Sequence, residues 1–236
     1  MAKIIDTGIY NNDQELYDKL VNELNDLHKD GVTLPPEYSH FIQDDLLRFL
    51  IRLARYKFVA RQLHPDDRVL EVGSGSGIGT LFLSQHCSEI LGIDVKDTEV
   101  EEAKSISNRS NVKFQKKDLF DFDHNSKFDA IVNLDVIEHL HKPNAQKLIK
   151  KMSQLLTQNG MLIIGTPSKH SYPYQGKLSR ASHIKCYDLP ELNNMIMENF
   201  SRTLRFSMND EVVHTGHYKM AWYYFVIAFY PKNNKN

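Results

Sequence analysis

Residues 68–79 read RVLEVGSGSGIG, and this stretch decides the fold of the chain. Val69, Leu70 and Val72 form a short apolar run that ends at Gly73, and a segment with helical periodicity follows. The pattern predicts a buried strand, a glycine-rich turn and a helix. Glycines let a ligand approach the backbone closely, and the amides that open a helix carry partial positive charge. We therefore expect a nucleotide-type pocket at the carboxyl end of this strand.

Two acidic residues near the turn indicate which nucleotide the pocket holds. Counted from Gly73, the sixth position is Ile78, so the G-x-G-x-x-G fingerprint of dinucleotide sites is absent. This argues against a nicotinamide-dependent oxidoreductase. Glu71 lies inside the strand, where a carboxylate suits a cationic ligand better than a pyrophosphate. Asp94 ends the next apolar run and can accept hydrogen bonds from both hydroxyls of a ribose.

At these residues the chain resembles the class I S-adenosylmethionine-dependent methyltransferases, which carry an acid-x-G-x-G-x-G loop after the first strand and an acid after the second. The resemblance runs from about Arg68 to Pro167. It implies S-adenosylmethionine as cofactor, with S-adenosylhomocysteine as its product. It also implies a Rossmann-like α/β fold with a mostly parallel seven-stranded sheet and a C-terminal antiparallel hairpin. The cofactor-binding residues that it implies are Glu71, Gly73, Ser74, Gly75, Gly77, Asp94, Val95, Asp118, Leu119, Asn133 and Leu134.

The rest of the chain fits one α/β domain with an N-terminal extension. Strand and helix patterns alternate from residue 64 to residue 231, which favours a parallel sheet. The leucines between residues 16 and 27 recur at helical spacing, and residues 38–63 form a second helical stretch. We expect residues 1–63 to form a helical cap, which could equally provide a homodimer contact. Asn159-Gly160 predicts a helix end, and residues 232–236 are disordered by composition.

Bulk properties restrict the partners. The formal net charge is −1, so there is no global electrostatic case for nucleic-acid binding. Cys87 and Cys186 form no C-x-x-C pair, as is usual in a reducing compartment. The N-terminus lacks the apolar core of a signal peptide, and no apolar run is long enough to span a membrane. We therefore expect a cytoplasmic protein that acts on a small-molecule acceptor.

A cluster of titratable residues follows the expected fourth strand. Asp135, Glu138 and His139 stand at i, i+3 and i+4, which would place them on one face of a helical turn. An imidazole titrates near neutral pH, so His139 is the candidate general base for an acceptor hydroxyl. Under the alternative reading, Glu138 only braces the turn and the pair is structural.

The long polar segment 168–185 supplies further candidates. Tyr172 and His183 lie in it, and we expect both to line the acceptor pocket because long loops in such folds usually carry substrate contacts. A divalent metal is a second option, since four residues together offer oxygen and nitrogen ligands: Asp135, Glu138, His139 and His183.

Two groups of methyltransferases share this E-H element. It resembles the ubiquinone-biosynthesis O-methyltransferases and the methyltransferase type 11 and 23 group. The small-RNA 3′-terminal 2′-O-methyltransferases carry E-x-x-E-H and a later histidine that bind a metal. Here the first acid is Asp135, and basic RNA-binding segments are not evident. We therefore expect O-methylation of a sugar, a nucleotide sugar or a quinone-like or natural-product phenol. N-methylation of an amine, metal-dependent RNA 2′-O-methylation and a non-catalytic binding protein stay open.

Overall fold

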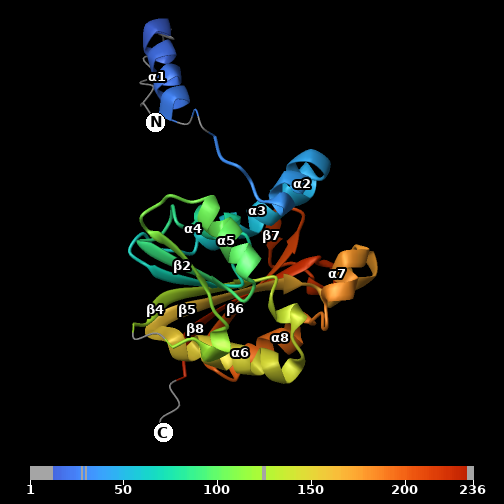
Figure 1. The fold of residues 1–236 in the computed structure, drawn as a ribbon. Helices are drawn as coiled ribbons and strands as arrows, with labels where there is room; N and C mark the ends of the chain where they lie inside the picture. Colours follow the sequence, from blue (N-terminus) through green and yellow to red (C-terminus); the bar gives the residue numbers. More distant parts are fainter. Residues whose placement is uncertain (1–12, 28, 30, 124–125, 233–236) are drawn as a thin grey trace, which may run out of the picture. The chain divides into compact units, whose positions relative to one another are not determined.

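The computed structural model describes residues 13–27, 29, 31–123 and 126–232, so the tail expected at residues 232–236 lies outside the described residues except for Lys232. The chain divides into two compact units, Met1–Thr33 and Leu34–Asn236. In the first unit, the regularly spaced leucines fall in helix α1 (Gln14–Leu27), as the sequence predicts, and no residue of α1 is buried. The second unit holds the sheet and all the other helices in the described ranges (Figure 1).

The sheet of the second unit has the strand order β3-β2-β1-β4-β5-β8-β6-β7. The first five of these strands run parallel, and β8, β6 and β7 add antiparallel pairs. The predicted α/β fold with a C-terminal antiparallel hairpin is confirmed, with eight strands in place of the expected seven. The strands are β1 (Arg68–Val72), β2 (Glu89–Asp94), β3 (Val112–Lys116), β4 (Phe128–Leu134), β5 (Leu156–Pro167), β6 (Phe200–Asn209), β7 (Val212–His214) and β8 (Tyr223–Pro231).

Helices cover both faces of the sheet because successive residues of the central strands point to opposite sides. Leu70 and Ile131 pack with residues of α6 and α8, whereas Val69 and Val132 pack with residues of α3 and α4. The helices are α2 (Pro36–Asp44), α3 (Leu46–Ala60), α4 (Ile78–Leu83), α5 (Asp97–Ser105), α6 (Lys142–Leu155), α7 (Lys177–Ser182) and α8 (Leu189–Met197). Four short 3₁₀ turns are η1 (Leu119–Asp121), η2 (Ile137–His139), η3 (Lys169–Tyr174) and η4 (Tyr218–Met220).

The second helical stretch of the sequence is divided in two. The α2 helix ends at Asp44 and α3 begins at Leu46, because the side chain of Asp45 accepts a hydrogen bond from Arg48 N and caps a new helix. The α6 helix ends at Leu155, four residues before the predicted stop at Asn159-Gly160, because β5 already pairs with β4 at Leu156. The predicted helix end was therefore wrong in position.

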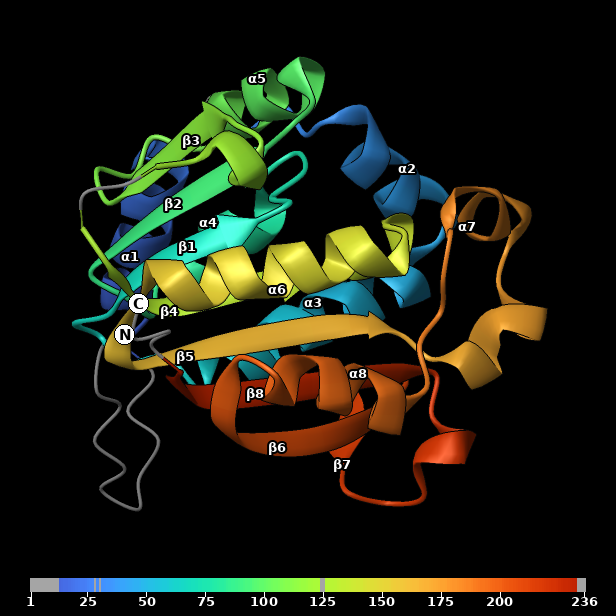
Figure 2. The same cartoon turned by 90° about the horizontal axis from the view of Figure 1, so that it is seen from below.

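Parallel strands bring their carboxyl ends to one edge of the sheet. Figure 2 shows the arrowhead of β5 pointing toward the side where α2 and α7 lie. The glycine turn, the end of β4 and the segment between β5 and α8 therefore gather at this edge. In doubly wound sheets, such an edge is where ligands bind. No helix in the described ranges has the length and apolar character that a membrane span needs.

Candidate active site

The glycine turn after β1 has a backbone that residues with side chains rarely adopt. Gly73, Gly75 and Gly77 have φ angles of 81°, 52° and 92°, all in the left-handed region. A Cβ atom at Gly73 would lie 2.2 Å from Cγ2 of Val136, and one at Gly77 would lie 2.7 Å from Cβ of Ala103. The turn therefore packs against α5 and against the segment after β4, and both contacts need glycine.

The turn is also bonded to the end of β2. Gly73 N and Ser74 N donate hydrogen bonds to the carbonyl oxygen of Ile93 at 2.8 and 3.1 Å. Gly75 N donates to Oδ2 of Asp94 at 3.0 Å, and the other oxygen of Asp94 accepts from Lys96 N at 2.9 Å. The structure thus brings the expected ribose acid against the glycine loop. Val95, also expected at the cofactor, follows Asp94 and is exposed.

Glu71 is buried beneath the turn, with 1% of its surface exposed. Its Oε2 accepts a hydrogen bond from the Thr80 hydroxyl, whereas Oε1 is buried without a hydrogen-bond partner. Burial raises the pKa of Glu71 to about 7, against the lowering effects of the Thr80 and Tyr56 hydroxyls and of the Arg52 charge. An unpartnered carboxylate oxygen inside a ligand edge is a place for a cationic donor.

The other expected cofactor residues lie at the ends of β3 and β4. Asp118 follows β3, and its side chain accepts a hydrogen bond from Phe120 N at 2.9 Å, which caps η1. Leu119 is buried in the core. Asn133 donates from Nδ2 to the Val72 carbonyl at 3.1 Å, and its Oδ1 is buried without a partner. Leu134 ends β4 beside Gly165 and is buried.

Three residues of α2 and α3 reach this edge, and sequence reasoning did not assign them. A Cβ atom at Gly79 would lie 2.4 Å from the Tyr56 hydroxyl, so Tyr56 covers the start of α4. The Tyr38 hydroxyl accepts a hydrogen bond from Ile78 N at 3.4 Å. The guanidinium of Arg52 lies 5.7 Å from the centroid of the Tyr38 ring. The i, i+4 spacing of Arg52 and Tyr56 was the sequence signal that could have revealed these two residues.

Asp135 departs from the expected helical turn. Its φ is 56°, so it cannot share a regular helical face with the residues that follow. Oδ2 of Asp135 lies 2.7 Å from Nη1 of Arg55, and the Arg55 guanidinium lies 4.0 Å from the centroid of the Tyr223 ring. Asp135 is therefore paired with a cation from α3. The group whose atoms could hold a metal does not include it.

Glu138, His139 and His183 do come together. One potential ligand atom from each lies within 4.8 Å of the others. Glu138 is fully buried, with Oε2 accepting a hydrogen bond from the Thr166 hydroxyl at 2.9 Å and Oε1 without a partner. Burial and the nearby Asp135 raise the pKa of Glu138 to about 8. Burial and the neighbouring His139 lower the pKa of His183.

Hydrogen bonds fix the tautomers of both imidazoles. Nδ1 of His139 lies 2.9 Å from the carbonyl oxygen of Ser182, and Nδ1 of His183 lies 2.8 Å from Oε1 of Gln175. Because both oxygens are acceptors, each Nδ1 must carry the hydrogen. Nε2 of each ring therefore keeps its lone pair, available for a proton or for a metal ion.

Tyr172, expected to line the acceptor pocket, lies in η3 and is exposed. Among the described residues, a ring contact joins His139 to His183, with centroids 5.1 Å apart, and none joins either histidine to Tyr172. Tyr174, two residues after Tyr172, contacts the ring of Trp222 instead, with centroids 5.7 Å apart.

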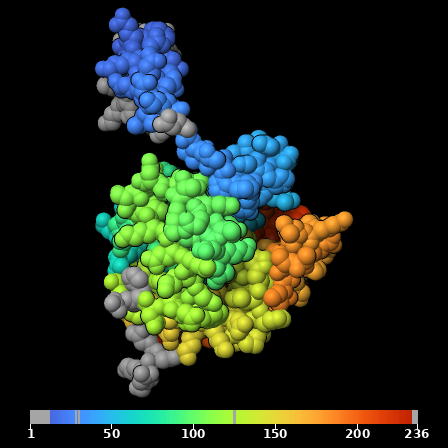
Figure 3. Space-filling model, in the orientation of Figure 1, coloured from blue at the N-terminus to red at the C-terminus, as the bar shows by residue number. Residues whose placement is uncertain are grey.

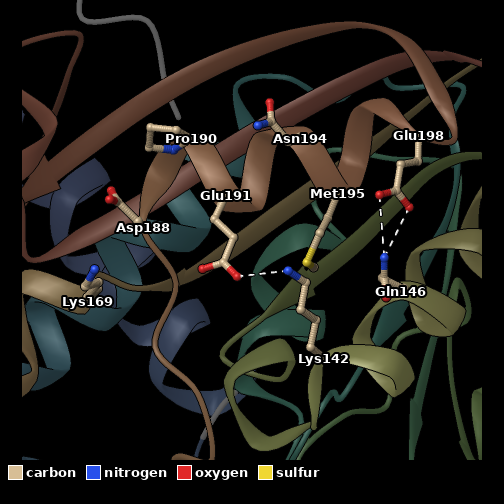
Figure 4. Close-up of a pocket in the computed structure, with 9 residues that line it drawn as sticks. All are labelled: Lys142, Gln146, Lys169, Asp188, Pro190, Glu191, Asn194, Met195 and Glu198. Atoms are coloured by element: carbon tan, nitrogen blue, oxygen red, sulfur yellow. Dashed lines mark hydrogen bonds and ion pairs between the residues drawn. The ribbon is translucent and has the colours of Figure 1, made fainter.

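A separate groove of about 500 Å³ lies between α6 and α8 (Figure 4). Glu191 reaches Lys142 across it, and Glu198 reaches Gln146. Met195 lies between these two polar contacts, as Figure 4 shows. None of the residues expected to bind cofactor or acceptor lines this groove. Glu191 with Lys142 and Glu198 with Gln146 already pair within the groove, so we assign it no role in the site.

Comparisons with known proteins agree with this geometry. A methyltransferase domain family matches residues 69–160. The ubiquinone biosynthesis O-methyltransferase of Coxiella burnetii (strain RSA 493 / Nine Mile phase I) is 25% identical over 139 residues, which are 57% of this chain and 58% of that protein. An uncharacterized methyltransferase of Staphylococcus carnosus (strain TM300) is 28% identical over 163 residues, which are 68% of this chain and 74% of that protein.

The fold is also shared with solved structures. The N-methyltransferase NodS of Bradyrhizobium japonicum WM9, solved in complex with S-adenosyl-L-homocysteine, superimposes with a TM-score of 0.57 at 17% identity, covering 78% of this chain and 88% of that one. At this identity the similarity shows the fold alone. The chain spans somewhat over half the length of the first ubiquinone-pathway relatives. The glycine turn, Glu71 and Asp94 all fall within residues 69–160, the range that matches the methyltransferase domain family.

Proposed function

We propose that the protein transfers the methyl group of S-adenosylmethionine to a hydroxyl oxygen of a small-molecule acceptor. The observation that carries the proposal is Glu71. Its carboxyl group is buried beneath the glycine turn, and one of its oxygens has no partner. A buried acid in that state fits a ligand with an ammonium group, and the methionine end of the cofactor has one.

The residues at the sheet edge fit the remaining parts of the cofactor. Asp94 offers carboxylate oxygens for the ribose hydroxyls. Arg52 pairs with Glu37 through one nitrogen at 2.5 Å, and a guanidinium has further donors for the cofactor carboxylate. Asp118 and Leu119 would frame the adenine. The backbone of the turn and the β4 end would line the rest: Gly73, Ser74, Gly75, Gly77, Val95, Asn133 and Leu134.

His139 is the residue we assign to the acceptor proton. The bound cofactor supplies an electrophilic methyl group, and the sulfonium charge disappears as the methyl group leaves. The protein must align the acceptor oxygen and accept its proton. Nε2 of His139 has its lone pair free because Nδ1 faces the Ser182 carbonyl. The hydroxyl proton therefore goes to Nε2 of His139, and His183 lies beside it to position the acceptor.

An amine acceptor is the alternative for the same site. Relatives and neighbours are named both for O-methyl transfer and for N-methyl transfer. An amine can lose its proton without a base on the protein, whereas a hydroxyl benefits from one. The free Nε2 of His139 at this edge is the reason we favour oxygen.

The first test is binding of S-adenosylhomocysteine, measured by calorimetry on folded protein. The second is release of S-adenosylhomocysteine across a panel of sugars, nucleotide sugars, phenols and amines. We expect turnover on a hydroxyl acceptor, with His139→Ala lowering turnover while cofactor affinity is retained. Absence of cofactor binding would overturn the proposal, and binding without turnover on any acceptor would favour a non-catalytic role.

A second candidate is metal-dependent 2′-O-methylation at an RNA end, and the convergence of Glu138, His139 and His183 favours it. These residues fit a divalent metal ion. Two nitrogens with free lone pairs and one unpartnered carboxylate oxygen form a mixed donor set. The Nδ1 hydrogen bonds of both histidines resemble the outer-shell contacts that orient metal-binding imidazoles. Asp135 would stay outside this set because it pairs with Arg55.

EDTA distinguishes the two candidates. Turnover that EDTA abolishes and that Mn²⁺ or Zn²⁺ restores would assign Glu138, His139 and His183 as ligands. Turnover that resists EDTA but falls in His139→Ala would assign His139 as the base. If neither treatment changes turnover, the E-H pair is structural and alignment of the acceptor is the main catalytic device.

A further inference from the structure

Two segments at this edge of the sheet, one after β5 and one before β8, have an unusual composition. We call residues 170–187 and 217–222 the collar. The collar contains Lys177, Arg180, Lys185 and Lys219 and no aspartate or glutamate, although the whole chain has a net charge of −1. Lys185 lies 3.0 Å from Glu191. The other three cations are exposed, and no ion pair within the described part of the chain involves them.

Large aromatic and apolar side chains are exposed in the same collar. Tyr174 is 75% exposed and Trp222 is 49% exposed, and their rings lie 5.7 Å apart at an interplanar angle of 57°. Leu178 and Met220 are also exposed. Figure 3 shows the collar segment around α7, in orange, projecting from the surface of the second unit. The collar therefore holds exposed aromatic rings and exposed cations in the same two segments, and these are the groups that bind bases and phosphates.

The two halves of the collar are held together at their base and reach the candidate site. Ser168 N donates a hydrogen bond to the Trp222 carbonyl at 2.8 Å, and Trp222 N donates to the Met208 carbonyl at 3.2 Å. Tyr174 precedes Gln175, whose side chain holds His183 through its Nδ1. Tyr174 is therefore adjacent in the chain to the residue that orients His183, and Ser182, whose carbonyl orients His139, lies in the same segment.

We propose that the collar binds a nucleotide that carries the acceptor hydroxyl. The base would stack on the face of Tyr174 or Trp222 with its edge against the other ring, and the phosphate groups would pair with Lys177, Arg180 and Lys219. A hydroxyl of the same molecule would then reach His139. This inference rests on the proposed methyl transfer and names its acceptor class. The shared chemistry is a nucleoside phosphate, whether it comes as a nucleotide sugar or as the end of an oligonucleotide.

A membrane surface is the competing occupant, and the collar fits it less well. Peripheral insertion needs a continuous apolar face. In the collar, Leu178 stands between Lys177 and Ser179, and Met220 follows Lys219, so cations interrupt the apolar side chains. The α7 helix is only six residues long and ends with serine. Tilted aromatic rings suit a planar base better than acyl chains.

The chain provides its own reporter, because Trp222 is its single tryptophan. The experiment is titration of tryptophan fluorescence on the full chain with UMP, AMP, UDP-glucose, a uridine hexanucleotide and phosphatidylglycerol vesicles. We expect nucleotides to quench the fluorescence saturably. Mononucleotides and UDP-glucose should bind with a shallow salt dependence, whereas the hexanucleotide should show a steep one. Tighter binding of UDP-glucose would identify a nucleotide sugar as the source of the nucleotide, and tighter binding of the hexanucleotide would identify the end of an oligonucleotide.

Charge reversal in the collar, with a matched control, decides the outcome. Lys177→Glu/Arg180→Glu should weaken nucleotide binding by roughly tenfold or more. Lys147→Glu/Lys150→Glu makes the same charge change on the exposed face of α6 and should leave binding unchanged. Both variants should bind S-adenosylhomocysteine like the wild type. No quenching by nucleotides, equal loss in both variants or binding to vesicles alone would overturn the inference. The proposed methyl transfer would fail separately, through lost binding of S-adenosylhomocysteine.

Discussion

At the scale of single residues, Glu71 makes the sharpest prediction. Glu71→Gln keeps the shape of the side chain and an oxygen for the Thr80 hydroxyl, but it removes the charge that a cofactor ammonium group would meet. We expect the affinity for S-adenosylhomocysteine to fall by about tenfold or more, as expected for loss of a charge-assisted hydrogen bond. Calorimetry measures this directly, and Glu101→Gln, an exposed change on α5, is the control.

The pH dependence of the same affinity tests the cause. Because burial raises the pKa of Glu71 to about 7, the carboxyl group is largely protonated in mildly acidic solution and charged above neutrality. Wild-type affinity should therefore rise with pH across this range, whereas the affinity of Glu71→Gln should vary less. Equal pH profiles would show that the Glu71 charge does not contact the cofactor.

The contacts of a side chain could be predicted from the sequence where its partner lies on an adjacent element of the fold, but not where the partner is distant in the chain. The contact of Asp94 with the glycine loop follows from two adjacent parallel strands. The pairing of Asp135 with Arg55 joins residues 80 positions apart, and nothing in the local pattern of either residue reveals it. The sequence groups His183 with His139 as potential metal ligands, and the two rings do lie together, although their approach depends on the path of a long segment.

At the scale of elements, three glycine substitutions separate strain from steric clash. Gly77→Ala places a Cβ atom 2.7 Å from Ala103 in addition to a φ of 92°, so it should be the most damaging. Gly75→Ala has no contact closer than 3.8 Å and should cost only the left-handed backbone, about 1–2 kcal/mol. Gly176→Ala, with open space and negative φ, should be neutral. Denaturant unfolding ranks the three variants, and equal effects for Gly75 and Gly77 would contradict the packing argument.

The elements themselves were largely readable, and their errors have physical causes. Buried parallel strands followed by glycine or acid give strong patterns, which is why β1, β2 and β4 were found. The α2–α3 break depends on one capping side chain, Asp45, inside a continuous helical pattern. The three residues of β7 are too few for a periodic signal, so the eighth strand was not expected.

At the scale of the whole molecule, a net charge hides how charge is distributed. The value of −1 argued against nucleic-acid partners, yet the collar has four cations and no acid. Charge balance over a chain bounds long-range attraction, whereas a binding surface depends on which charges remain unpaired nearby. The homodimer contact that the sequence left open for the N-terminal helices stays a prediction.

The last prediction concerns the stability of the whole molecule. Burial raises the pKa of Glu71 to about 7 in the native state, against the ordinary glutamate value of 4.5 that it has in the unfolded chain. Below pH 4.5 Glu71 is protonated in both the native and the unfolded state, so its contribution to the free energy of unfolding is highest there. As pH rises between the two values, the unfolded chain loses its proton first, and the native state loses stability relative to it. The free energy of unfolding should fall by an amount on the order of 3 kcal/mol from this group alone.

Comparing variants isolates that contribution, because Glu71→Gln cannot titrate at this position while every other group still does. The difference in unfolding free energy between wild type and Glu71→Gln should move in favour of the variant as pH rises from about 4.5 to about 7, and then level off. Chemical denaturation at a series of pH values measures the difference, with Glu101→Gln as the charge-matched control. If the two curves stay parallel, the Glu71 carboxyl group is not held protonated in the folded protein. The cofactor ammonium would then meet a charge that is already present.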